Sequence, residues 1–257
     1  MIAVQQLCFA YPGKPPLFDR FDLTVAAGEA WSVIGPSGCG KSTLLRMLAG
    51  LQKPDGGSIR IDGRQLTRPR PRTGFVLQDH GLLPWFTVRD NVRLGLSIRG
   101  FYGPDGRHAP PESFTDRSDW PARVDEWMQR LGIAAFQRDY PLRLSRGQRQ
   151  RVALARTLVL DPDLLLLDEP FSALDAPTRD DLHALLDALQ AERRRTRLLV
   201  THDIQEAVRM GERILVLGAS ARHPATVVEN RRAGVAGIDP GFGDQCRRLH
   251  ALLGAMT

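Results

Sequence analysis

The sequence predicts an α/β protein built on a parallel β-sheet, and three features support this fold class. The short apolar stretches "AWSVIG", "DLLLLD" and "TRLLVTH" have the length and composition of buried strands. The last two each follow a stretch with helical character, which is the order of elements typical of a parallel sheet. At 257 residues, 42% of them hydrophobic, the chain is long enough to bury a sizeable core.

Before residue 87 the chain is rich in expected strands. "QQLCFAY" and "FDLTVAA" alternate in polarity around a turn at "YPGKPP", which predicts two strands. The strand "AWSVIG" runs into glycines and then into "TLLRMLAGL", which predicts a helix. "GGSIRIDG" is expected to form a hairpin strand pair, and "RTGFVLQ" another buried strand.

From residue 87 to residue 151 the pattern changes to helices. Residues 100–121, "GFYGPDGRHAPPESFTDRSDWP", are rich in Gly, Pro and polar side chains and predict a long loop or insertion. Near the end, "DQCRRLHALLGAM" predicts a short amphipathic helix with Leu249, Leu252 and Leu253 on one face. We expect that face to pack on the core rather than on lipid.

Composition restricts the partners that the chain is expected to have. The net charge is +6 and the pI about 9.8, but the arginines are scattered apart from "RPRPR" and "RRRTR", so a nucleic-acid surface is not expected. Three cysteines without metal-ligand spacing fit a reducing cytosol. We expect no signal peptide, and no apolar run approaches the ~20 residues that cross a bilayer. A membrane role is therefore expected to require a partner.

The stretch "GPSGCGKST" matches the phosphate-binding pattern G-x-x-x-x-G-K-[ST] between a strand and a helix. Its backbone N–H groups and the helix N-terminus would hold phosphates, Lys41 would reach the β- and γ-phosphates, and Ser42 would bind Mg²⁺. A glycine-rich turn with a surface lysine is the alternative. We expect Cys39 to be a small loop residue rather than a nucleophile. The expected ATP-binding residues of this loop are Gly35, Pro36, Ser37, Gly38, Cys39, Gly40, Lys41, Ser42 and Thr43.

Polar residues at three strand ends form the expected hydrolytic half of the site. "LLLLDEP" delivers two carboxylates to the carboxyl edge of the sheet, where Asp168 would hold Mg²⁺ and Glu169, on the other side of the pleat, would take a proton from the attacking water. His202 ends "LLVTH" and emerges on the same edge. Gln78, after "GFVL", could touch both Mg²⁺ and the water. Strands that simply end in polar turns are the alternative.

The stretch "LSRGQRQR" could be a nucleic-acid grip, a solvated helix face, or part of a site that one chain does not complete. Ser145 followed by Gln148 is a capping-box pattern ahead of an apolar helical run. Ser145 is therefore expected at a helix N-terminus, which is an anion site, with the arginines on the solvated side.

Six motifs in order, "GPSGCGKST", "FVLQ", "LSRGQRQ", "LLLLDEP", "SALD" and "LLVTH", resemble the ATP-binding-cassette (ABC) ATPase family over residues 1–217. The resemblance implies a RecA-like P-loop core, residues 1–86 and 152–217, with an antiparallel β-subdomain. It also implies a helical subdomain at 87–151 with an insertion at 100–121, followed by a C-terminal extension at 218–257.

In that family two cassettes pair head to tail, so the resemblance assigns each ATP to two chains. Ser145, Arg146, Gly147 and Gln148 form the signature that would meet the γ-phosphate held by the other chain, although Arg146 replaces the family's usual glycine. His202 would contact the γ-phosphate, and Asp175 of "SALD" would lie on the loop between the cassettes. Tyr11 resembles the aromatic that stacks on adenine; a strand-face aromatic beside Phe9 is the alternative.

The resemblance implies an ATPase that uses ATP and Mg²⁺ and drives an importer. Its expected partners are a second copy of the chain, transmembrane permease subunits and, indirectly, a solute-binding protein, but no nucleic acid. Its expected place is the cytoplasmic face of a bacterial plasma membrane. "QDHGLLPWFTVRDNV" and the "DEPFSALDAPTRDDLH" region resemble importers of nitrate, alkanesulfonates and taurine. The alternative is a soluble cassette ATPase that acts on nucleic acid or a protein assembly.

Overall fold

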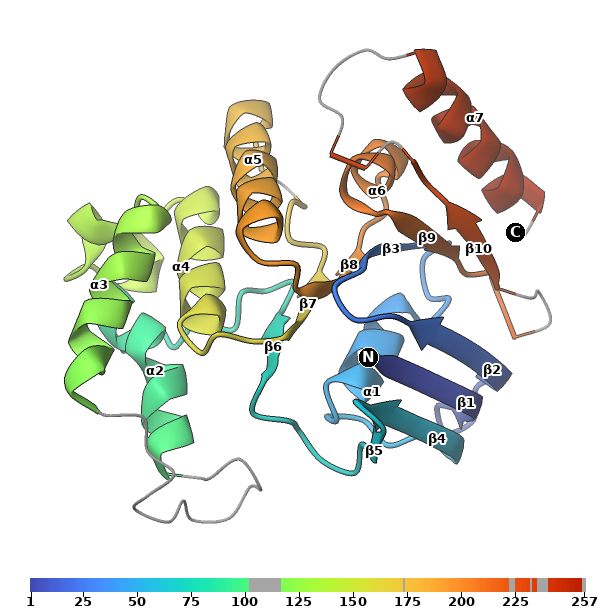
Figure 1. The fold of residues 1–257 in the computed structure, drawn as a ribbon, viewed down its shortest axis with the longest axis horizontal. Helices are drawn as coiled ribbons and strands as arrows, with labels where there is room; N and C mark the ends of the chain where they lie inside the picture. The colour runs from blue at the N-terminus through green and yellow to red at the C-terminus, as the bar shows by residue number, and fades with distance from the viewer. Residues whose placement is uncertain (102–116, 173, 222–224, 232, 235–239, 256–257) are drawn as a thin grey trace.

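Two β-sheets and the helices around them form the structure (Figure 1). The computed structural model describes residues 1–101, 117–172, 174–221, 225–231, 233–234 and 240–255. One sheet is antiparallel and contains the N-terminal strands, at the lower right of Figure 1. The other is largely parallel and runs through the middle of the molecule.

The antiparallel sheet has the strand order β2-β1-β4-β5. Its strands are β1 Ile2–Ala10, β2 Pro16–Val25, β4 Gly56–Ile61 and β5 Arg64–Gln65. Both N-terminal strand predictions are confirmed. The hairpin prediction was wrong in its bounds, because "GGSIRIDG" supplies only β4 and the turn, while β5 follows it. Asp62 (φ 50°) and Gly63 (φ 75°) make that turn, and two successive positive φ angles suit a tight hairpin.

The second sheet has the order β10-β9-β3-β8-β7-β6, and its strands are parallel except for β10. The strands are β3 Ala30–Ile34, β6 Thr73–Val76, β7 Leu164–Asp168, β8 Thr196–Val200, β9 Arg213–Val216 and β10 Thr226–Glu229. Every residue of β3, β7 and β8 is buried, as expected where helices or a second sheet cover both faces. The predicted parallel α/β sheet is confirmed.

The helices lie in three places around this sheet (Figure 1). Helix α1 lies against the antiparallel sheet, α2 to α4 pack on one another with α5 on the same core, and α6 and α7 pack together beside β9. The helices are α1 Lys41–Leu48, α2 Val88–Phe101, α3 Trp120–Arg130, α4 Arg146–Leu158, α5 Ala176–Glu192, α6 Ile204–Met210 and α7 Pro240–Ala255. Short 3-10 turns occur at Arg117–Asp119, Ala134–Phe136 and Pro141–Arg143.

Alternate leucines of the parallel sheet belong to different cores. Leu164 and Leu166 pack with α1 and the antiparallel sheet, whereas Leu165 and Leu167 pack with α2 to α5. Each fully buried leucine contributes about 1.5–3 kcal/mol relative to an exposed one. The central strands therefore fix the antiparallel sheet on one face of the parallel sheet and helices α2 to α5 on the other.

The loop predicted for residues 100–121 was wrong at both ends. Gly100 and Phe101 complete α2, and a 3-10 turn leads into α3, which contains Trp120 and Pro121. Trp120 is buried in the helical core, which explains why helix replaces loop there in spite of the polar composition. Pro121 lies in the first turn of α3, where its missing N–H costs nothing. Residues 102–116 lie outside the described residues.

The C-terminal helix α7 is longer than predicted and packs on the protein, as expected. Leu249 is fully buried against α6 and β9, and Leu252 and Leu253 are partly buried beside it. The three leucines therefore form the inner face of α7. Within the part of the chain that the structure describes, every helix is too short or too polar to span a bilayer.

We expect Leu249→Ala to lower the free energy of unfolding by about 2–4 kcal/mol, because it leaves a cavity between α7 and the sheet. Chemical denaturation of the purified chain measures this. His250→Ala, at the exposed neighbouring position, is the control and should change stability by less than about 0.5 kcal/mol. Equal stability of the two variants would contradict the packing of α7 described above.

Candidate nucleotide-binding site

The loop between β3 and α1 is shaped by glycines. Gly40 has φ 104°, a conformation that side chains rarely adopt, and a Cβ there would lie 3.0 Å from the ring of Phe18. A Cβ at Gly35 would lie 2.6 Å from the carbonyl oxygen of Leu217. These two positions therefore require glycine, and they let the backbone curl tightly into the first turn of α1.

A cavity of about 540 Å³ opens over this loop and brings together most of the predicted ATP-binding residues. It is lined by Tyr11, Lys14, Pro15, Pro16, Leu17, Ser37, Gly38, Gly40, Lys41, Ser42, Thr43, Glu169, Ala219 and Ser220. Gly35, Pro36 and Cys39 are not among the lining residues. Residues 14–17 and 219–220 also line the cavity but belong to no sequence motif. Only the fold brings these two segments to the loop.

The Lys41 ammonium lies over the loop. Its Nζ donates hydrogen bonds to the carbonyl oxygens of Gly35, at 2.8 Å, and Pro36, at 2.9 Å. The side chain is largely buried, so its position is fixed by these carbonyls rather than by water. A positive charge at the N-terminus of α1 adds to the partial positive charge of the helix end, which makes the cavity suited to anionic phosphates.

Ser42 and Asp168 meet at the end of β7, where Ser42 Oγ donates to Asp168 Oδ1 at 2.9 Å. Asp168 is only 3% exposed. Burial raises the pKa of its carboxyl, and the nearby charge of Glu169 acts in the same direction, while the Ser42 hydrogen bond opposes the rise. A hydroxyl and a buried carboxylate are oxygen ligands suited to Mg²⁺, whose charge would favour the ionised carboxylate.

Glu169 is held by two other predicted catalytic residues. Its Oε2 accepts a hydrogen bond from Gln78 Nε2 at 3.2 Å and lies 3.3 Å from His202 Nδ1. The three residues follow the ends of β6, β7 and β8, which are neighbours in the sheet. Parallel strands thus deliver to one edge three side chains that lie far apart in the sequence.

The backbone turns sharply at Glu169. Its φ is 48°, in the left-handed region that is uncommon for residues with a side chain, while its N–H still donates to the carbonyl of Val200 at 3.0 Å. The side chains of Asp168 and Glu169 were predicted to point in opposite directions because of the strand pleat alone. The backbone turn at Glu169 also contributes to this difference. Strained conformations of this kind concentrate at functional sites.

Tyr11 lies at the rim of the cavity, directly after β1. Its ring makes an edge-to-face contact with Phe9, with centroids 5.0 Å apart, and its hydroxyl lies 3.2 Å from Thr43 Oγ1. The contact with Phe9 is the one expected of a strand-face aromatic. The position at the cavity rim is the one needed to stack on a base, so the geometry accommodates both interpretations.

The signature stretch begins α4 with the predicted capping box. Gln148 N donates to Ser145 Oγ at 3.2 Å, and Ser145 N donates to Gln148 Oε1 at 2.8 Å, which confirms the predicted helix start. A Cβ at Gly147 would come within 2.5 Å of Thr178 Cγ2 on α5, so a side chain there would force Thr178 to shift. Ser145 and Arg146 are exposed. Of the described residues, those of the signature do not line the cavity of their own chain.

Asp175 is the N-cap residue of α5 and is exposed. It follows the buried Leu174, so the loop that leads into α5 is anchored on the core beside an open surface.

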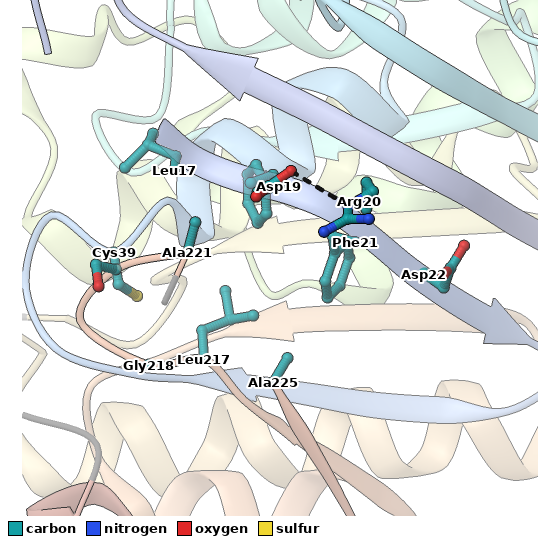
Figure 2. A pocket seen from close by; sticks show the side chains of 12 residues that line it. Leu17, Asp19, Arg20, Phe21, Asp22, Cys39, Leu217, Gly218, Ala221 and Ala225 are labelled. Atoms are coloured by element: carbon teal, nitrogen blue, oxygen red, sulfur yellow. Dashed lines mark ion pairs between the residues drawn. The ribbon is translucent and has the colours of Figure 1, made fainter. Parts of the chain in front are cut away.

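A smaller cavity of about 300 Å³ lies behind the phosphate loop, between β2 and the segment after β9 (Figure 2). Cys39 lies at one end of this cavity, next to Leu217. Burial raises the pKa of the Cys39 thiol, so little reactive thiolate forms at neutral pH. This agrees with Cys39 as a small packed residue rather than a nucleophile.

Comparison with known proteins adds to this geometry. Residues 18–172 match the ABC transporter family. The aliphatic sulfonates import ATP-binding protein SsuB of Bacillus cereus is 39% identical over 219 residues, 85% of this chain and 80% of that protein. The taurine import ATP-binding protein TauB of Shigella flexneri is 40% identical over 236 residues, 92% of this chain and 86% of that protein.

A solved structure gives the same result for the fold. The dimeric post-hydrolysis state of an ATP-binding cassette bound to ADP and Pi has a TM-score of 0.76 and 30% sequence identity, covering 90% of this chain and 99% of that one. The predicted cassette fold, with its P-loop core, antiparallel sheet and helical group, is thereby confirmed. The chain belongs to the ABC transporter family, as an ATP-binding cassette ATPase.

Proposed function

We propose that the chain is the ATP-hydrolysing subunit of an importer for a small solute of the nitrate, alkanesulfonate and taurine group. The observation that supports this most is the convergence of Gln78 and His202 on the carboxylate of Glu169 beside the phosphate loop. The likeness to import proteins for sulfonates and taurine supports the solute class.

The residues of this chain divide the chemistry among them. Lys41 and the loop backbone bind the β- and γ-phosphates of ATP, and Tyr11 stacks on the adenine. Glu169 takes the proton from the attacking water, which Gln78 orients. His202 contacts the γ-phosphate.

Ser42 and Asp168, already joined at 2.9 Å, would hold Mg²⁺ together with Gln78. When bound, the ion neutralises charge on the β- and γ-phosphates.

The signature serves the ATP of a second copy of the chain. Ser145 and Gly147 present the N-terminus of α4, an anion site that does not line its own chain's cavity. In a head-to-tail pair this site meets the γ-phosphate bound by the partner copy, and Asp175 lies on the loop between the two. Arg146 is exposed beside Ser145, where its side chain would either alter the close approach of the phosphate or add a positive charge near it.

A loop after β6 provides the surface for the transmembrane subunits. Residues 83–86 form an apolar row, "LPWF", in which Pro84 and Trp85 are exposed and Leu83 and Phe86 are partly buried. Trp85 is 67% exposed. The loop behind it is rigid, because the buried Asn91 amide donates to the carbonyls of Leu83 and Phe86, both at 3.1 Å. A large aromatic ring held outward by a fixed loop is typical of a protein interface.

We expect Trp85→Ala to leave the purified chain folded and able to bind ATP, but to reduce its co-purification with the permease subunits or to uncouple ATP hydrolysis from solute uptake. Removing an aromatic anchor from an interface typically costs about 2 kcal/mol or more, about 30-fold in affinity. Co-purification from membranes and uptake into proteoliposomes measure the effect. Val227→Ala, at a second exposed apolar residue on β10, is the control.

Solute-stimulated ATP hydrolysis by the reconstituted assembly tests the proposed function. It uses the chain assembled with the permease and the solute-binding protein at the cytoplasmic face of the membrane, and the substrate class predicts that an alkanesulfonate, taurine or nitrate stimulates ATP hydrolysis. An assembly that hydrolyses ATP without responding to any of these solutes would contradict the substrate class. Hydrolysis stimulated by nucleic acid instead would favour the alternative, a soluble cassette ATPase.

A further inference from the structure

The residue before His202 fixes the backbone on both sides of it. Thr201 is buried at the end of β8, and its Oγ1 donates to Glu206 Oε2 at 2.6 Å and accepts from the N–H of Asp203 at 3.0 Å. One hydroxyl thus bridges the strand end, the residue after His202 and helix α6. The His202 side chain itself is 68% exposed, so packing on the ring contributes little to its position.

Glu206 connects this hydroxyl to a second loop of the site. Its other oxygen, Oε1, lies 3.7 Å from Arg179 Nε on α5. Arg179 Nη2 donates in turn to the carbonyl oxygen of Leu174 at 3.1 Å, next to Asp175. Burial raises the pKa of the Glu206 carboxyl, and the Thr201 hydrogen bond and the Arg179 charge oppose the rise. The carboxylate is therefore costly to bury, and the contacts with Thr201 and Arg179, together with the nearby His202, offset part of that cost.

The chain of contacts joins two places that the proposed function treats separately. At one end is the loop before α5, whose Asp175 faces the partner copy. At the other end is His202, 3.3 Å from the carboxylate of Glu169. Leu174, Arg179, Glu206 and Thr201 form the route between them, through one ion pair and two hydrogen bonds.

We propose that Thr201, Glu206 and Arg179 are positioning residues. They couple the position of the loop before α5 to the position of His202, and they thereby set the rate of ATP cleavage without touching the nucleotide. The inference rests on the proposed function, in which His202 contacts the γ-phosphate. A displacement of about 1 Å in such a contact is sufficient to cost 10²-fold in rate.

The test compares steady-state ATP hydrolysis by the purified full chain and its variants, together with affinity for a fluorescent ATP analogue and thermal stability. Thr201→Val keeps the shape of the side chain but removes the hydroxyl, and Thr201→Ser restores it. Arg179→Gln removes the ion pair from the side of α5. Arg209→Gln is the matched control, because it removes another ion pair between the same two helices, Arg209 to Asp180 at 3.3 Å, that touches neither loop.

We expect Thr201→Val to lower kcat by about 10- to 100-fold and Arg179→Gln by about 3- to 10-fold, with KM and analogue affinity within about twofold of wild type. Thr201→Ser and Arg209→Gln should retain kcat within about threefold. Unchanged kcat in both Thr201→Val and Arg179→Gln would overturn the inference.

Two further results would also overturn the inference. A loss of kcat in Arg209→Gln equal to that in Arg179→Gln would show that helix packing alone is responsible. A parallel loss of nucleotide affinity and thermal stability in both Thr201→Val and Arg179→Gln would assign these residues a structural role. Normal hydrolysis by Glu169→Gln, by contrast, would contradict the proposed function itself and is measured separately.

Discussion

Glu169→Gln is expected to lower ATP hydrolysis by about 10²- to 10⁴-fold, while the affinities for ATP and Mg²⁺ stay close to those of the wild type. The glutamine amide has the size and shape of the glutamate carboxylate, so it can keep the contacts with Gln78 and His202. It cannot accept the proton of the attacking water. Turnover and calorimetric ATP binding, measured on the same preparation, separate the two effects.

Lys41→Ala is the control for that experiment. It removes the ammonium that lies over the loop, so it should weaken nucleotide binding itself rather than the chemical step alone. Near-normal turnover by Glu169→Gln would remove this residue from the mechanism. A loss of ATP affinity equal to that of Lys41→Ala would assign it to binding instead.

Ser145→Arg is expected to reduce hydrolysis by about 10²-fold or more, the scale of losing one preorganised donor to a developing charge. The larger side chain would block the N-terminus of α4 and remove the hydroxyl that caps Gln148 N. Binding of ATP to the loop of the same chain should persist, because Ser145 does not line that cavity. Hydrolysis and ATP affinity of the variant check both parts.

Arg143→Ala serves as a control close to Ser145, since Arg143 is highly exposed and lies outside the signature stretch. It should retain hydrolysis within about twofold. If Ser145→Arg hydrolysed ATP at the wild-type rate, the signature would have no part in the reaction.

The parts of the site that depend on local sequence could be predicted from it. The capping box at Ser145 needs only two side chains three residues apart, and the phosphate loop needs glycines between a strand and a helix. The meeting of Gln78, Glu169 and His202 was also predictable, because apolar strands of a parallel sheet end at one edge. Their hydrogen bonds, however, required the strand order of the sheet.

Other parts depend on contacts that no local pattern records. Residues 219–220 reach the cavity only because β9 lies next to β3, and Trp120 becomes helical because the helical core buries it. The hairpin after β4 is an exception: Asp62-Gly63 is a local turn signal, and its two positive φ angles set a turn that the apolar pattern alone does not show. The route from Arg179 to Thr201 joins two helices and a strand end, and its residues are unremarkable in sequence.

The central claim, that each ATP is shared between the loop of one chain and the signature of another, has a direct test. Ser145→Arg and Lys41→Ala chains would each form homodimers with two damaged sites. A mixed dimer has one site with the intact loop of the first chain and the intact signature of the second, while its other site carries both changes.

The measurement is vanadate-dependent nucleotide trapping by a mixture of the two inactive variants, with mixed dimers isolated through two different affinity tags. Shared sites predict that trapping returns at one site per mixed dimer, because one loop and one signature remain intact across the interface. A signature that acts on its own chain predicts no recovery at any mixing ratio. Isolated mixed dimers that trap no nucleotide would contradict the shared site.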